Sequence, residues 1–230
     1  MVKGGTTMTK KLFLSAMTKF GLGVVLSGLL VFVPAGTLDF WNGWLFMGVL
    51  FIPMLLAGIV MMIKSPGLLE KRLKAKETRR EQSLVVKLSG LMFIVGFITA
   101  GISHRFDLLV APRSVAVIFA VMFLLGYGMY AEVLRENAYL SRVIEVQEGQ
   151  KVIDTGLYGI VRHPMYSATV SLVLAMPLIL GSWISFVIFL VYPVLIGIRI
   201  KGEEEFLEQE LEGYREYKQK VKWRLVPFVW

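Results

Sequence analysis

Long apolar runs separated by short polar segments organise this chain. Four runs contain 20 or more residues and lie at about 12–33, 41–63, 84–103 and 114–134. A helix needs about 20 such residues to cross the hydrocarbon core of a bilayer. Two shorter runs of sixteen residues, at 165–180 and 183–198, are joined by a Gly-Ser pair, and each contains a proline. The pattern predicts an all-α integral membrane protein with about six membrane segments, four full spans and a short helical hairpin at 165–198.

The polar segments divide the chain into two predicted parts. Residues 1–134 hold the four long runs and a strongly charged loop at 64–87, which we interpret as a solvated helix or one lying among lipid headgroups. Residues 135–230 hold a polar loop, the hairpin and a last segment with apolar positions at helical spacing. That spacing predicts a cytoplasmic amphipathic helix at 202–221.

Composition agrees with a membrane protein and excludes several classes of function. Of the 230 residues, 56% are hydrophobic and 18% are charged, which is too apolar for an ordinary soluble surface. The net charge is +8, but apolar runs interrupt the basic residues, so we expect no nucleic-acid partner. The absence of cysteine excludes disulfides, thiolate metal sites, cysteine nucleophiles and S-palmitoylation.

The distribution of positive charge predicts the orientation in the membrane. If the six segments cross or dip and return, 23 of the 25 lysines and arginines lie on one side, together with both termini and the 135–163 loop. The positive-inside rule assigns that side to the cytoplasm. The first apolar run is too long for the core of a signal peptide, so we expect a retained helix.

Two polar clusters flank the hairpin and should converge when it folds back. His163 and Tyr166 lie at its start, close to a predicted helix start at Pro164, where unpaired N–H groups favour an anionic ligand. Arg199 and Glu203 follow it, four residues apart on one helix face. Each residue alone also has a simpler interpretation, as a helix cap, an interfacial aromatic, a snorkelling arginine or a solvated acid. Their convergence favours one site.

The clusters contain motifs that resemble a known family. Arg-His-Pro-Met-Tyr at 162–166 and Arg-Ile-Lys-Gly-Glu-Glu at 199–204, with the flanking segments 151–158, 211–217 and 224–227, are similar to the isoprenylcysteine carboxyl methyltransferase family. That family belongs to a wider group of integral-membrane methyltransferases that includes phospholipid methyltransferases. The resemblance covers about residues 135–230.

The resemblance implies a cofactor and a set of site residues. S-adenosylmethionine, with S-adenosylhomocysteine as product, would occupy a cytoplasmic pocket, while the substrate would be a lipid-like molecule or a lipidated protein. Arg199 would face the substrate, and Glu203 would balance Arg199 or hold the cofactor. The implied cofactor-binding residues are Gln150, Lys151, Val152, Ile153, Tyr158, His163, Pro164, Met165, Tyr166, Glu203 and Glu204. An ionised carboxylate acceptor needs alignment rather than a general base.

Other functions remain open from the sequence. The same cofactor could serve an amine acceptor such as a phospholipid, which would need a base because an ammonium must first lose a proton; Glu204 and His163 are the candidates. A non-catalytic membrane scaffold is a third hypothesis, and a nicotinamide-dependent sterol-type reductase is a weaker fourth. His104 and His163 fall on opposite membrane faces in the predicted topology, so they cannot share a metal ion.

Overall fold

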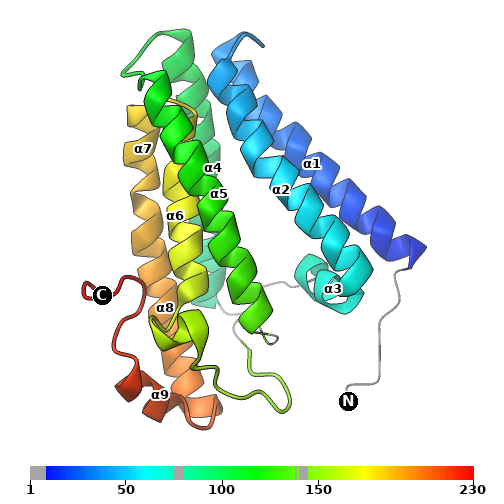
Figure 1. Cartoon of the computed structure of the whole chain (residues 1–230). Coiled ribbons are helices and arrows are strands. Elements are labelled where there is room, and N and C mark those ends of the chain that lie inside the picture. Colours follow the sequence, from blue (N-terminus) through cyan, green and yellow to red (C-terminus); the bar gives the residue numbers. More distant parts are fainter. Residues whose placement is uncertain (1–8, 75–79, 138, 140–144) are drawn as a thin grey trace.

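The computed structural model describes residues 9–74, 80–137, 139 and 145–230, and within them the protein is helical without a β-strand. Figure 1 shows the helices as long, roughly aligned rods with the short elements gathered at one end. The elements are α1 (Lys10–Ala35), α2 (Trp41–Lys64), α3 (Pro66–Lys74), α4 (Arg80–Arg105), α5 (Arg113–Glu136), the 3-10 helix η1 (Gly156–Gly159), α6 (Pro164–Ile179), α7 (Trp183–Phe189), α8 (Val191–Glu210) and α9 (Tyr214–Lys220).

The helices identify a multi-pass membrane protein. Within the described residues, five stretches are long and apolar enough to cross a bilayer: α1, α2, most of α4, α5, and α7 together with α8. Helices α1, α2, α4 and α5 form where the four full spans were predicted. Helix α6 has 16 residues, about 24 Å of rise, and is shorter than a hydrocarbon core of about 30 Å.

The second arm of the hairpin is longer than predicted. Helix α7 ends at Phe189, and α8 begins at Val191 and continues to Glu210. The interruption at Leu190 has a local cause: Pro193 has no N–H to donate, and its ring would clash with the carbonyl group four residues earlier. Helices α7 and α8 nevertheless form one continuous apolar stretch, so this half of the hairpin is long enough to span the membrane.

The sequence predicted one amphipathic helix at 202–221, and this prediction is wrong because the structure has parts of two helices there. Its first half is the end of α8, and its second half is α9. Between them the chain turns at Gly213, whose φ of 82° lies in the left-handed region that favours glycine. The apolar spacing still has a structural meaning, because Leu211, Tyr214 and Val221 are buried in one cluster.

The helices pack around an aromatic core in the membrane region. Buried side chains from α2, α4, α5 and α7 meet there, including Phe46, Phe97, Phe123 and Phe189. Helices α4 and α5 pack against α6, and α4 also packs against α7 and α8. In Figure 1 the α1–α2 pair meets this bundle at the upper end and diverges from it towards α3. Arg72 of α3 donates a 2.7 Å hydrogen bond to Tyr130 of α5 and so reconnects the lower end.

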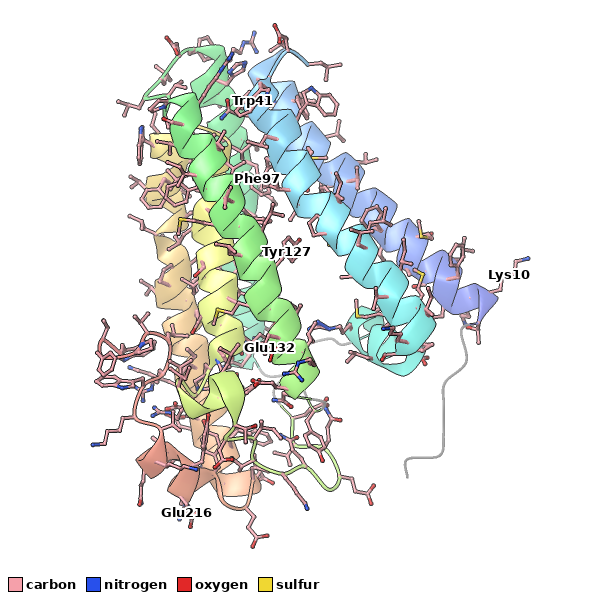
Figure 2. The ribbon with its side chains drawn as sticks, in the orientation of Figure 1. Lys10, Trp41, Phe97, Tyr127, Glu132 and Glu216 are labelled. Atoms are coloured by element: carbon pink, nitrogen blue, oxygen red, sulfur yellow. The ribbon has the colours of Figure 1, made fainter. Side chains whose placement is uncertain are left out.

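The two ends of the bundle are chemically different. At the upper end, marked by Trp41 in Figure 2, His104 stacks on Phe40 with 4.0 Å between ring centroids. Ser103 and Ser182 share a 2.7 Å hydrogen bond there, next to the α6–α7 turn. At the lower end the 145–163 segment, α9 and the C-terminal segment cover the helix ends. His163 lies at that lower end, so the two histidines are on opposite ends, as predicted.

Candidate active site

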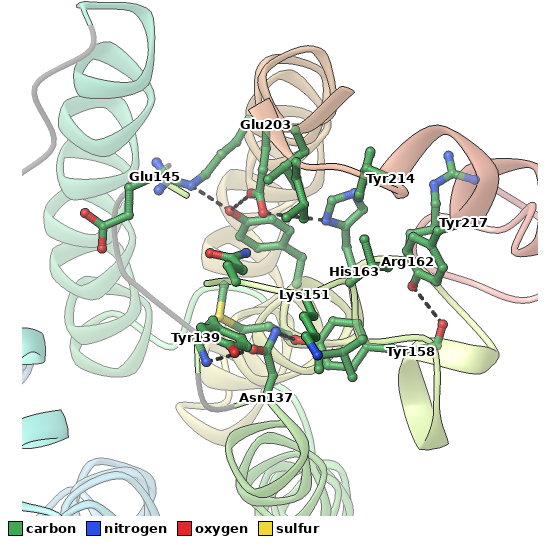
Figure 3. Close-up of a pocket in the computed structure, with 18 residues that line it drawn as sticks. Asn137, Tyr139, Glu145, Lys151, Tyr158, Arg162, His163, Glu203, Tyr214 and Tyr217 are labelled. Carbon is green, nitrogen blue, oxygen red and sulfur yellow. Dashed lines mark hydrogen bonds and ion pairs between the residues drawn. The ribbon is translucent and has the colours of Figure 1, made fainter. Parts of the chain in front are cut away.

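A polar chamber lies at the lower end of the bundle, enclosed by the 145–163 segment, the start of α6, the end of α8 and α9 (Figure 3). Its volume is about 110 Å³, several times the space that one water molecule needs. Its lining residues are Asn137, Tyr139, Glu145, Gln150, Lys151, Val152, Ile153, Tyr158, Arg162, His163, Met165, Tyr166, Arg199, Glu203, Leu207, Leu211, Tyr214 and Tyr217.

Tyr166 joins the two halves of the hairpin across the chamber. Its hydroxyl group donates to Oε2 of Glu203 at 2.6 Å and accepts from Nε of Arg199 at 2.9 Å. Arg199 and Glu203 lie on one face of α8 because they are four residues apart. Nη1 of Arg199 also contacts Oε1 of the buried Gln82 on α4 at 3.4 Å. The arginine that the sequence assigned to the substrate is therefore held by two other helices.

Glu204 forms a buried network behind the chamber. Its side chain is 2% exposed. Oε1 accepts hydrogen bonds from Nε of Arg162 at 2.8 Å and lies 3.2 Å from Nε2 of His163. Oε2 accepts from Nε of Arg224 at 3.0 Å. A buried carboxylate is tolerated when such partners neutralise it and satisfy its lone pairs. Glu204 thus fixes the position of His163 in the wall.

The C-terminal segment takes part in this network. The N–H groups of Arg162 and His163 donate to the carbonyl oxygens of Trp223 and Arg224, at 2.8 and 3.0 Å. Nη1 of Arg162 also donates to the carbonyl oxygen of Val221 at 2.7 Å. These contacts bind residues just before α6 to a segment about 60 positions later, so the closing segment shapes the wall of the chamber.

Tyrosine side chains line the side of the chamber near η1 and α9. Tyr217 donates a 2.7 Å hydrogen bond to the carbonyl oxygen of Tyr158, whose own hydroxyl group accepts from Nδ2 of Asn137 at 3.0 Å. Burial raises the pKa of Tyr158 to about 12. Its hydroxyl group therefore stays neutral at physiological pH and serves only as a hydrogen-bonding group.

The structure brings most of the sequence-predicted site residues to one chamber. Only two of them do not line it: Pro164 is fully buried at the start of α6, and Glu204 lies behind His163. They support the wall instead of facing the hollow. The implied site residues did not include eight others that line the chamber: Asn137, Tyr139, Glu145, Arg162, Leu207, Leu211, Tyr214 and Tyr217. For Leu207, Leu211 and Tyr214, the helical spacing of 207, 211 and 214 was the available signal.

A second hollow lies beside the chamber, within the membrane region. It is an apolar groove between α4, α5, α6 and α8, and Arg72 of α3 lies at its edge. The groove shares Met165, Tyr166 and Arg199 with the chamber. Its other lining residues are Val85, Val86, Ser89, Gly90, Phe93, Tyr130, Thr169, Tyr192 and Ile196. A polar hollow and an apolar one therefore meet at a tyrosine and an arginine.

Comparison with known proteins gives one family. A family model described as phospholipid methyltransferase matches residues 114–212, which covers α5, η1, α6, α7 and α8. No curated protein matches the chain. The matched stretch includes Glu203 of the chamber, and it includes Tyr166 and Arg199, which border both hollows. The match indicates a membrane methyltransferase, a class for which S-adenosylmethionine is the implied methyl donor.

Proposed function

We propose that the protein is an S-adenosylmethionine-dependent membrane methyltransferase that esterifies the carboxylate of a lipid-like, isoprenylcysteine-type substrate. The observation that carries this proposal is the shared wall of Tyr166 and Arg199 between the polar chamber and the apolar groove. A water-soluble cofactor and a membrane-soluble acceptor can approach such a wall from opposite sides. We further propose that the chamber opens to the cytoplasm, as the charge distribution predicts.

The residues of the chamber fit this cofactor. The side chain of Glu203 is 23% exposed and offers a carboxylate to a cationic group, while Val152, Leu207 and Leu211 offer an apolar surface to a flat base. Residues 150–153 of the polar loop also line the chamber. When bound, the cofactor would supply an electrophilic methyl group on a sulfonium. Glu203 and the loop would hold it, and the enclosing helices would exclude water.

Arg199 favours a carboxylate as the acceptor. Its guanidinium group is buried and held by Tyr166 and Gln82, so it can orient an anionic oxygen by a charge-assisted contact without rearranging. A carboxylate is already ionised at neutral pH and needs no proton transfer before attack. Methyl transfer to it also consumes charge, so a poorly hydrated site at the end of an apolar groove favours the reaction.

An amine acceptor is the second candidate, and the description of the matched family favours it. An ammonium would have to lose a proton to a base. His163 and Glu204 are engaged with each other at 3.2 Å, and Glu204 does not line the chamber. Glu203 would be the more accessible base, but the nearby Arg199 would repel a cationic headgroup. The geometry therefore supports the carboxylate over the amine.

The acceptor is tested by methyl transfer from labelled S-adenosylmethionine to a panel of detergent-dispersed acceptors. The panel contains prenylcysteine acids, the same compounds as amides, and phosphatidylethanolamine. We expect label on the acids alone, released by mild alkali as a methyl ester does. Alkali-stable label on the phospholipid would replace the proposal with N-methylation. Cofactor binding without label on any lipid acceptor would argue against a lipid methyltransferase, and absence of both would favour a scaffold.

A further inference from the structure

Tyr214 differs from the other tyrosines of the chamber. It is 4% exposed and lines the hollow, yet its hydroxyl group is buried without a hydrogen-bond partner among the described residues. By contrast, Tyr217 donates to Tyr158, Tyr158 accepts from Asn137, and Tyr166 donates to Glu203. A buried polar group without a partner is rare in proteins and calls for an explanation. Because Tyr214 lines the chamber, a bound ligand could supply the missing partner.

The surroundings of Tyr214 define the kind of ligand atom. Its ring packs against that of Tyr217 with 5.8 Å between centroids, in a cluster with Leu211 and Val221. Leu207 and Val152 extend this apolar surface along the chamber. A flat heterocyclic base is suited to such a surface, because its faces are apolar and its polar atoms lie at the edge.

The charges near Tyr214 argue against an anionic ligand group there. Burial, and then the carboxylates of Glu204 and Glu203, raise the pKa of Tyr214, while Arg162 acts in the opposite direction. The hydroxyl group therefore remains protonated and can donate one hydrogen bond. Arg162 is already bound to Glu204 and to main-chain oxygens. A further carboxylate would be repelled, so a neutral acceptor fits the position best.

We propose that the hydroxyl group of Tyr214 donates a hydrogen bond to the nucleoside part of the methyl donor, at a ring nitrogen or a ribose oxygen. This makes α9 part of the cofactor site and assigns the nucleoside to the wall formed by Val152, Leu207, Leu211 and Tyr214. The inference rests on the proposed function. Tyr214 is not among the implied cofactor-binding residues, and it lies outside the matched stretch at 114–212.

Binding calorimetry on the full chain in detergent tests this assignment. Tyr214→Phe is compared with wild type and with Tyr217→Phe, using two probes: S-adenosylhomocysteine, and 5′-methylthioadenosine, which keeps the nucleoside but lacks the amino-acid part. Tyr214→Phe should weaken both probes by about fivefold to tenfold, the effect of one net hydrogen bond. Thermal unfolding without ligand should be unchanged or slightly raised, because no hydrogen bond within the protein is lost.

The control variant measures the effect of losing a hydrogen bond within the protein. Tyr217→Phe removes a hydrogen bond to Tyr158, so it should lower the unfolding temperature of the unliganded protein. Unchanged affinity of Tyr214→Phe for both probes would overturn the inference while leaving the proposed function intact. Weaker binding of S-adenosylhomocysteine alone would also overturn it, because the contact would then be to the amino-acid part. A folded wild type that binds neither probe would remove the proposed function together with this inference.

Discussion

At the scale of single residues, the site depends on a few buried side chains that hold one another. Tyr166 is the common partner of Arg199 and Glu203, and His163 is fixed by Glu204. The sequence motifs identified these residues because each carries an unusual chemistry for an apolar chain. They could not identify Tyr214, because its importance depends on a missing partner, which only the folded arrangement reveals.

Arg199→Ala separates substrate orientation from cofactor binding. Loss of the guanidinium group should reduce methyl transfer by about 100-fold or more, as removal of a preorganised charged donor does, while the affinity for S-adenosylhomocysteine changes little. Initial rates and calorimetry measure the two effects. Arg135→Ala is the control, because Arg135 forms only an exposed pair with Glu132 at the end of α5. Full activity in Arg199→Ala would remove the role assigned to this residue.

The titration of Tyr158 tests whether its side chain is buried in the folded protein. Its pKa is raised to about 12 by burial, against about 10 for an unfolded tyrosine. The unfolded state therefore releases this proton first, and the contribution of Tyr158 to stability should be lost as the pH rises from about 10 to 12. The difference in tyrosinate absorbance between wild type and Tyr158→Phe should rise near pH 12. A rise near pH 10 would show that the side chain is solvated.

At the scale of helices, the lengths of the apolar runs predicted the four long spans better than they predicted the hairpin. The runs that became α1, α2, α4 and α5 are bounded by charged or polar residues, so their ends were visible. The arm at 183–210 was cut short in the prediction because Arg199 and the glutamates after it resemble a membrane boundary. In the structure Glu204 is buried and paired with Arg162, and α8 continues to Glu210. Arg199 and Glu203 both bind the hydroxyl group of Tyr166.

The contact between α4 and α8 should matter for activity more than for folding. A side chain at Gly202 would place its Cβ atom 2.5 Å from Nε2 of Gln82, the residue that contacts Arg199. Because Gln82 can move, Gly202→Ala should still fold, but the displaced amide should release Arg199 and lower kcat about tenfold or more.

Gly197→Ala on the same helix is the matched control for this substitution. Its Cβ atom would lie 3.6 Å from the ring of Trp230, an ordinary contact. Both alanines should raise helix propensity equally, so only Gly202→Ala should affect kcat. Equal kcat values for the two variants would show that Gln82 does not position Arg199.

At the scale of the whole molecule, the two hollows explain why the site is built at one end of a membrane bundle. Helix α4 forms one side of the apolar groove, and α5 contributes Tyr130 to it. The sequence could not assign them this role, because their groove residues belong to no motif and lie within long apolar runs. The positive charge gathers at the end that carries the chamber, which supports a cytoplasmic site.

The natural absence of cysteine allows a direct test of orientation. Asp39 lies in the exposed α1–α2 turn, and Glu216 lies on the exposed surface of α9 at the chamber end. Two variants, Asp39→Cys and Glu216→Cys, each introduce one cysteine. A membrane-impermeant maleimide should label Asp39→Cys in intact cells and Glu216→Cys only after the membrane is opened. The reverse pattern would place the chamber outside the cytoplasm and contradict the proposed orientation.

The most direct test of the central claim is calorimetric binding of S-adenosylhomocysteine to the purified protein. We predict one site per chain, weakened in Glu203→Gln, which keeps the shape of the side chain and an acceptor for Tyr166 but removes the negative charge. Ligand at 100 times its dissociation constant should also stabilise the fold by about 2.7 kcal/mol. A well-folded wild type that binds no S-adenosylhomocysteine would contradict the assignment of the chamber as a methyl-donor site.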